Sequence, residues 1–108
     1  MEKTENWVKI AADIKEISFG ENKIATFKIA DKTICIAKLN DDLKAFSARC
    51  PHAGGDLSQG ILDKKENIIC PVHGYRFSIN SGRDVDGEGY FLKIYKIEQT
   101  DEGIFIRL

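Results

Sequence analysis

The sequence is poor in cysteine, histidine and proline, and it has little net charge and no long apolar run. Its 108 residues include three cysteines, two histidines and two prolines, and the formal net charge is −1. Charges of both signs are interspersed, so the chain offers no basic face for nucleic acid and no polybasic patch for a membrane. The first ten residues contain no apolar signal segment, and no run is long enough to span a bilayer. We therefore expect a cytoplasmic protein that binds neither nucleic acid nor membrane.

A helical pattern is also missing. No segment of ten or more residues repeats its apolar side chains at a helical period, and the chain shows no internal repeat or linker. At 108 residues it is long enough for one domain with a modest core and no disulfides. Short stretches rich in Ile, Thr and Phe alternate with turn residues, as is typical of β-strands. We predict a single all-β domain over residues 1–108, built from antiparallel strands.

The order of the expected strands suggests how this domain is organised. Two strands joined by Asp31-Lys32 are predicted to form a hairpin, and a terminal hairpin is expected at Thr100–Gly103, where the glycine tolerates a positive φ. The two ends of the chain would then form a base of antiparallel strands, with residues of about 47–80 inserted as a small subdomain. The expected strands are 7–12, 15–19, 23–30, 33–39, 43–48, 60–62, 66–69, 75–80, 91–98 and 104–108.

Both histidines and two of the three cysteines lie in one stretch. They are arranged as Cys50-x-His52 and Cys70-x-x-His73, separated by residues 53–69. A single Cys-x-x-His pair would be weak evidence, because buried cysteines and isolated histidines are common. Here neither histidine lies outside the pattern. The spacing of the four side chains therefore indicates a metal site.

The order of the ligands bears on which metal is bound. Structural zinc sites usually place like ligands together, as Cys-x₂₋₄-Cys and His-x₃₋₅-His, whereas here cysteine and histidine alternate. The single residue between Cys50 and His52 also makes it awkward for both side chains to reach one ion. Two neighbouring irons suit the pattern better, with Cys50 and Cys70 on one iron and His52 and His73 on the other. A structural zinc module used for binding is the alternative.

The two boxes, CPHAGG at 50–55 and CPVHGYRF at 70–77, resemble the C-x-H and C-x-x-H ligand boxes of the Rieske iron–sulfur family. The resemblance covers nearly the whole chain, since small Rieske ferredoxins are about this long. It implies an all-β fold in which residues of about 47–80 form a cluster-binding subdomain. It also implies one [2Fe–2S] cluster per chain, with the ligands Cys50, His52, Cys70 and His73.

The chain departs from the quinol-oxidising branch of that family. That branch carries an extra cysteine in each box, and the corresponding positions here are Gly55 and Val72, so the disulfide between the boxes is absent. It also carries a serine and a tyrosine whose hydroxyls donate hydrogen bonds to cluster sulfur. The matching positions here are Tyr75 and Phe77, and Phe77 has no hydroxyl. Fewer donors stabilise the reduced cluster less, so we expect a potential toward the low end of roughly −150 to +300 mV.

Because it lacks the extra cysteines and one of the hydroxyls, the sequence resembles the low-potential ferredoxins of aromatic-ring dioxygenases and the small subunit of assimilatory nitrite reductase. The resemblance implies a one-electron carrier between an NAD(P)H-dependent reductase and a terminal oxygenase or similar enzyme. A small, non-catalytic subunit of a nitrite-reductase-like enzyme is the alternative. Rieske oxygenases also need a mononuclear iron held by two further histidines and a carboxylate. No histidine is left for that site, so we expect that the chain is not itself an enzyme.

Two features lie outside the motif. Cys35 falls in the apolar run 33–39 and is expected to be a buried free thiol. The polar segment 83–89 contains the acidic residues Asp84, Asp86 and Glu88. We interpret it as a solvated loop, with a docking surface for a basic partner as the alternative.

Overall fold

A computed structural model describes residues 6–40, 42–51, 54–72 and 74–108. It confirms the prediction of an all-β fold, because the regular elements among these residues are β-strands and two single-turn 3-10 helices, Ile14–Glu16 and Leu57–Gln59. No helix in this part of the chain is long and apolar enough to cross a membrane. The strands are β1 (Trp7–Ala11), β2 (Ile24–Ile29), β3 (Lys32–Leu39), β4 (Asp42–Ser47), β5 (Ile61–Leu62), β6 (Asn67–Ile69), β7 (Arg76–Ser78), β8 (Ile94–Thr100) and β9 (Gly103–Arg107).

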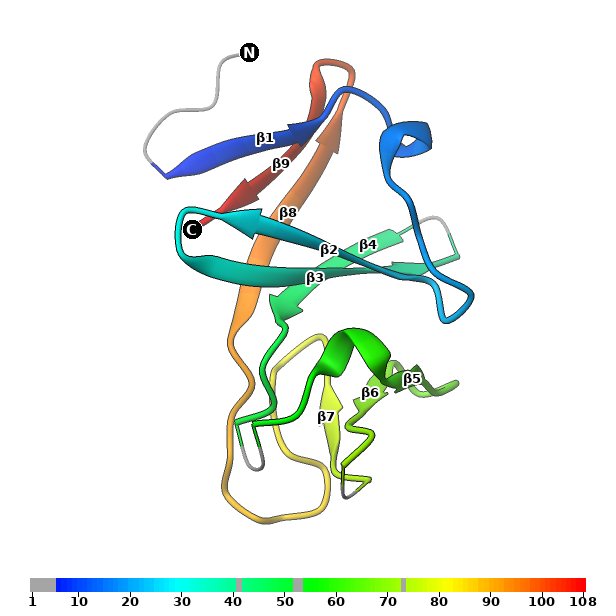
Figure 1. Ribbon diagram of the computed structural model, residues 1–108, viewed down its shortest axis with the longest axis vertical. Coiled ribbons are helices and arrows are strands. Elements are labelled where there is room, and N and C mark those ends of the chain that lie inside the picture. The colour runs from blue at the N-terminus through cyan, green and yellow to red at the C-terminus, as the bar shows by residue number, and fades with distance from the viewer. Residues whose placement is uncertain (1–5, 41, 52–53, 73) are drawn as a thin grey trace.

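The strands form two antiparallel sheets of different size. The larger has six strands in the order β1-β9-β8-β4-β3-β2 and so combines both ends of the chain. The smaller has the order β5-β6-β7 and comes from the middle of the chain. The two sheets occupy opposite halves of the molecule, with the large sheet in the upper half of Figure 1. This is the arrangement of terminal base strands and inserted middle strands that the sequence predicts.

Strand β3 is buried on both of its faces. Ile34 and Ile36 belong to the core of the large sheet, whereas Cys35 and Ala37 belong to the core that the large sheet shares with the small one. Alternate side chains of a strand point to opposite faces, so one strand serves both cores. The thiol of Cys35 is completely buried, as the sequence predicts.

The shared core lies directly beneath the predicted ligand boxes. Its fully buried members include Phe46, Leu57 and Phe77, and both Cys50 and Cys70 belong to the same cluster of apolar residues. Fully burying one large apolar side chain stabilises a fold by about 1.5–3 kcal/mol. The cysteines of the two boxes are therefore held in the shared core.

One predicted strand is wrong. Residues 15–19 were expected to continue the first strand, but the chain makes a 3-10 turn at Ile14–Glu16. The carboxylate of Asp13 accepts a hydrogen bond of 2.9 Å from the amide of Lys15, and Glu16 accepts one of 2.8 Å from the amide of Ala12. Acidic side chains compete in this way with the hydrogen bonds of a sheet.

The two predicted hairpins form, but one turn is displaced. Ile29 pairs with Lys32, so the turn residues are Ala30 and Asp31, one position earlier than expected. Ala30 accordingly adopts a φ of +58°, which the sequence gives no reason to expect of an alanine. In the terminal hairpin Thr100 pairs with Gly103, as predicted.

Candidate metal centre

The first ligand box forms a tight loop, which we call loop 1 (residues 50–55, of which 52–53 lie outside the described residues). The amide of Cys50 donates a hydrogen bond of 2.8 Å to the carbonyl of Gly55, and the amide of Gly54 donates one of 2.8 Å to the carbonyl of Cys50. Gly54 has a φ of +68°, a conformation that favours glycine. The loop therefore closes on itself around the backbone of Cys50.

The second box forms a loop with the same frame, which we call loop 2 (residues 70–75, of which 73 lies outside the described residues). The amide of Cys70 donates a hydrogen bond of 2.8 Å to the carbonyl of Tyr75, and the amide of Gly74 donates one of 2.9 Å to the carbonyl of Cys70. Gly74 has a φ of +73°. The two boxes thus differ in sequence but place their cysteines in equivalent backbone frames.

The two loops touch at Gly55. A Cβ atom placed on this residue would lie 2.5 Å from Cγ2 of Val72 and 3.0 Å from Sγ of Cys70. The first distance is shorter than real Cβ contacts, so only glycine fits here without a shift of its neighbours. Gly55 and Val72, the positions at which the sequence resemblance places the additional cysteines of the quinol-oxidising branch, are adjacent in space.

The residues of the two loops differ in exposure, which distinguishes an inner side from an outer side. Cys50 and Cys70 are exposed to only 1% and 0%. Pro51, Gly54 and Val72 are exposed. The thiols consequently face the shared core, while the outer backbone of the loops faces solvent.

The two predicted histidine ligands, His52 and His73, lie outside the described residues, and their role as ligands stays a prediction. Among the described residues, no three side chains of the types His, Cys, Asp or Glu are grouped closely enough to hold a metal ion. The structure therefore brings together the loops of Cys50 and Cys70, and it leaves the complete set of four ligands untested.

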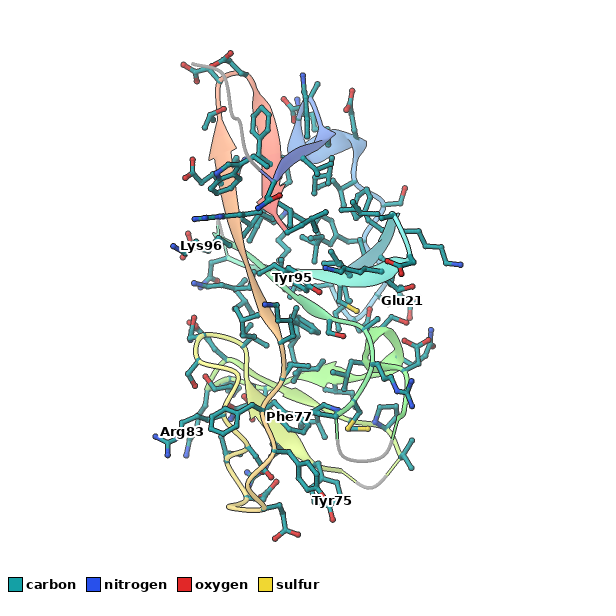
Figure 2. All side chains as sticks on the ribbon, turned by 90° about the vertical axis from the view of Figure 1, so that its left-hand side faces the viewer. Glu21, Tyr75, Phe77, Arg83, Tyr95 and Lys96 are labelled. Atoms are coloured by element: carbon teal, nitrogen blue, oxygen red, sulfur yellow. The ribbon has the colours of Figure 1, made fainter. Side chains whose placement is uncertain are left out.

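Tyr75 and Phe77 occupy different environments. Phe77 is completely buried in the shared core, whereas Tyr75 lies at the far end of the small subdomain (Figure 2). Partial burial and the nearby Glu88, Tyr90, Asp84 and Asp86 raise the pKa of the Tyr75 phenol above its usual value. The phenol of Tyr75 therefore stays protonated to a higher pH than an isolated tyrosine does, mainly because of its partial burial.

Hydrogen bonds to acidic side chains fix the backbone of the polar segment 83–89. The guanidinium of Arg76 contacts Oδ1 of Asp86 at 2.7 Å, and the amide of Arg76 donates a hydrogen bond of 3.1 Å to Oδ2 of the same carboxylate. Asp84 accepts hydrogen bonds from the amides of Asp86 and Glu88 at 2.8 and 3.0 Å. Asp84 therefore organises the loop itself and Asp86 holds it against β7, which favours the interpretation as a solvated loop.

Sequence reasoning missed two residues that support the loops. The side-chain amide of Asn22 donates hydrogen bonds of 2.8 and 2.9 Å to the carbonyls of Ser58 and Gly60, so a turn of the base holds the segment that follows loop 1. The guanidinium of Arg49 lies against Gly54 of loop 1. The position of Arg49 directly before Cys50 was the only available signal. For Asn22 there was none, because its contacts are 36 and 38 residues away in the sequence.

Comparison with known proteins agrees with this geometry. A family model described as the Rieske [2Fe-2S] domain matches residues 6–90. The ferredoxin component of the naphthalene 1,2-dioxygenase/salicylate 5-hydroxylase systems of Ralstonia sp is 30% identical over 80 residues, which are 74% of this chain and 73% of that protein. The ferredoxin of carbazole 1,9a-dioxygenase from Nocardioides aromaticivorans IC177 superposes with a TM-score of 0.79 at 19% identity, over 95% of this chain and 98% of that one.

A second kind of relative is much longer than this chain. The oxygenase component of 3-ketosteroid-9-alpha-monooxygenase of Rhodococcus rhodochrous is 43% identical over 49 residues. These residues are 45% of this chain but only 12% of that protein. The similarity is therefore confined to a small part of the oxygenase component.

Proposed function

The chain belongs to the Rieske [2Fe-2S] domain family, and from this premise we propose that it is a one-electron carrier of the ferredoxin type. The proposal is that it takes electrons from an NAD(P)H-dependent reductase and passes them to an oxygenase or a similar redox enzyme. It is supported by the relative from the naphthalene and salicylate systems, a ferredoxin component of which the chain covers 73%. On this proposal the chain is a component of an oxidoreductase system and not itself an enzyme.

The observation that carries the proposal is the pair of equivalent loops around Cys50 and Cys70. Both thiols are buried, and they come from loops that touch each other through Gly55. Gly55 has no side chain that would crowd the Sγ atom of Cys70, so the donor set and its surroundings fit an iron–sulfur group. We assign Cys50 and Cys70 as the ligands of one iron and His52 and His73 as the ligands of the other, with one cluster per chain.

A bound Rieske cluster supplies a site that accepts and releases one electron. The contribution of the chain is to hold the ligands still while the charge changes. The four backbone hydrogen bonds of loops 1 and 2, at 2.8–2.9 Å, keep the two cysteines in place. Leu57 and Phe77 are completely buried in the same core and exclude water from the inner side of the loops.

We propose that electrons enter and leave through the outer side of the two loops. Pro51, Gly54, Val72 and Gly74 are exposed there, and small or apolar residues let a partner approach the backbone closely. The loops lie at the end of the molecule away from β1 and β9 (Figure 1). A partner can therefore dock on the loops without contact with the terminal strands.

Metal and sulfide analysis tests the proposal. The purified protein is expected to be coloured, to contain iron and acid-labile sulfide in equal amounts, and to give a rhombic electron paramagnetic resonance (EPR) signal when it is reduced. Replacement of Cys50 or Cys70 by serine should abolish the signal, whereas Cys35→Ser should keep it. A protein that binds zinc and contains no sulfide would contradict the proposal. Copurification with a catalytic chain would instead indicate a subunit of a nitrite-reductase-like enzyme.

A further inference from the structure

The side chain of Arg49 folds back over loop 1. A Cβ atom placed on Gly54 would lie 3.6 Å from both Nε and Nη2 of Arg49 and 4.0 Å from its Cζ. Ordinary van der Waals distances to this added atom place the guanidinium beside Gly54 of loop 1. Arg49 is an exposed residue, and its charged group lies beside the loop of Cys50.

Within residues 6–40, 42–51, 54–72 and 74–108, no carboxylate forms a salt bridge with Arg49. Asp56 stands opposite Arg49 in an isolated β-bridge, and its Oδ1 accepts hydrogen bonds of 2.9 and 2.6 Å from the amide and hydroxyl of Ser58. Asp31, Lys32 and Asp56 line the same surface depression as Arg49, and of these four charged groups the guanidinium of Arg49 is the one found beside Gly54.

We propose that Arg49 raises the reduction potential of the centre held by loops 1 and 2. The inference rests on the proposed function. Reduction adds one negative charge to the centre, and a positive charge fixed against loop 1 attracts it and so favours the reduced state. The potentials of iron–sulfur centres depend on net charge and solvent exposure. An arginine keeps its charge over the whole working pH range, so this contribution is independent of pH.

Solvent limits the size of the effect. Because the guanidinium is exposed, water and salt screen its field, with a Debye length of about 10 Å at 0.1 M ionic strength. The position beside Gly54 keeps the charge close to loop 1. We therefore expect a measurable shift that becomes smaller as ionic strength rises.

Three variants of the cluster-loaded protein test the proposal, with the midpoint potential as the readout. Arg49→Gln removes the charge and keeps a polar side chain of moderate length, and Arg49→Lys keeps the charge. Arg107→Gln is the matched control, because it makes the same change in net charge on β9, an exposed position in the other half of the molecule (Figure 1).

Arg49→Gln is expected to lower the ratio of reduced to oxidised centre at a given potential by up to about tenfold. For one electron this is a shift of about 59 mV toward negative potential. Arg49→Lys should retain most of the wild-type potential, and Arg107→Gln should leave it unchanged. The difference between wild type and Arg49→Gln should shrink between low and high salt.

Equal midpoints for Arg49→Gln and Arg107→Gln would overturn the proposal. A fall in Arg49→Lys as large as that in Arg49→Gln would also overturn it, because the effect would then not arise from charge. Both results presuppose the rhombic signal of a loaded centre in the wild-type protein. Absence of that signal would instead refute the proposed function, so the two failures are distinguishable.

Discussion

A Cβ atom placed on Gly55 would lie 3.0 Å from Sγ of Cys70, so the two ligand loops meet at a position that has no side chain. The contact joins residues of different boxes and places the backbone of loop 1 directly against a thiol of loop 2.

Gly55→Ala is expected to reduce the amount of cluster that the protein holds. The added methyl group would collide with Cγ2 of Val72 and crowd the Sγ atom of Cys70, and overpacking of this kind typically costs about 1–3 kcal/mol. Iron and sulfide per chain provide the measurement. Val72→Ala alone should change little, because Val72 is 51% exposed. The double variant should recover part of the lost iron, and no recovery would mean that the clash with Val72 is not the cause.

Phe77→Ala is expected to destabilise the fold by about 3–5 kcal/mol. Phe77 is completely buried in the core beneath the loops, and its removal leaves a cavity next to the cysteines. Phe91→Ala is the matched control, since Phe91 is 66% exposed and its loss should stay within about 0.5 kcal/mol. Urea unfolding followed by circular dichroism measures both. Equal free energies of unfolding for the two variants would contradict the assigned core.

Asn22→Ala is expected to loosen the segment after loop 1. The variant loses the hydrogen bonds to Ser58 and Gly60, each worth about 0.5–1.5 kcal/mol. Amide hydrogen exchange should therefore become faster in residues 57–60 than in β8 or β9. The control is Asn80→Ala, which removes one exposed hydrogen bond of 2.8 Å to Glu66. If exchange in 57–60 is unchanged, Asn22 does not hold this segment.

Cys35 is expected to make the protein less stable at alkaline pH. Burial and, to a lesser degree, the charge of Asp56 raise the pKa of its thiol from 9.0 to about 12. Between these two values the unfolded chain releases the proton while the folded chain retains it. The stabilising contribution of the protonated thiol to the free energy of unfolding is therefore fully present below pH 9. It is lost as the pH rises toward 12, with a slope of at most about 1.4 kcal/mol per pH unit.

The contribution of Cys35 is isolated by comparison with Cys35→Ala. Other groups with raised pKa values, such as Tyr75 and Tyr95, are present in both proteins, so their effects cancel in the difference. The free energy of unfolding should decline more steeply with pH in the wild type than in the variant between pH 9 and 11. Parallel curves would show that the thiol titrates normally.

The parts of the fold that could be predicted from sequence are those set by local pattern. Alternation and turn residues located the hairpin that pairs Thr100 with Gly103. The prediction failed where a polar side chain replaced a sheet hydrogen bond, as at Asp13, or where a residue without turn preference adopted a positive φ, as at Ala30. Such choices depend on the neighbours in the folded chain.

The candidate site, too, could be predicted from the sequence only in part. Residue type and spacing were sufficient to single out Cys50 and Cys70, and the structure places their loops in contact. The assignment of Cys50, His52, Cys70 and His73 as ligands, the boundaries of the subdomain at about 47–80, and the cytoplasmic location stay predictions. The contacts of Asn22 and Arg49 could not be predicted, because a single polar residue in a turn or beside a cysteine has many possible partners until the chain is folded.

The presence and type of the cluster are best tested by a redox titration of the purified protein, followed by EPR at low temperature. We expect a rhombic signal with a midpoint near the low end of the Rieske range, roughly −150 mV, because Phe77 offers no hydroxyl to the site. A midpoint several hundred millivolts higher would show that the interpretation of Tyr75 and Phe77 is wrong. Absence of the signal in a protein that contains zinc would contradict both the iron–sulfur cluster and the role as an electron carrier.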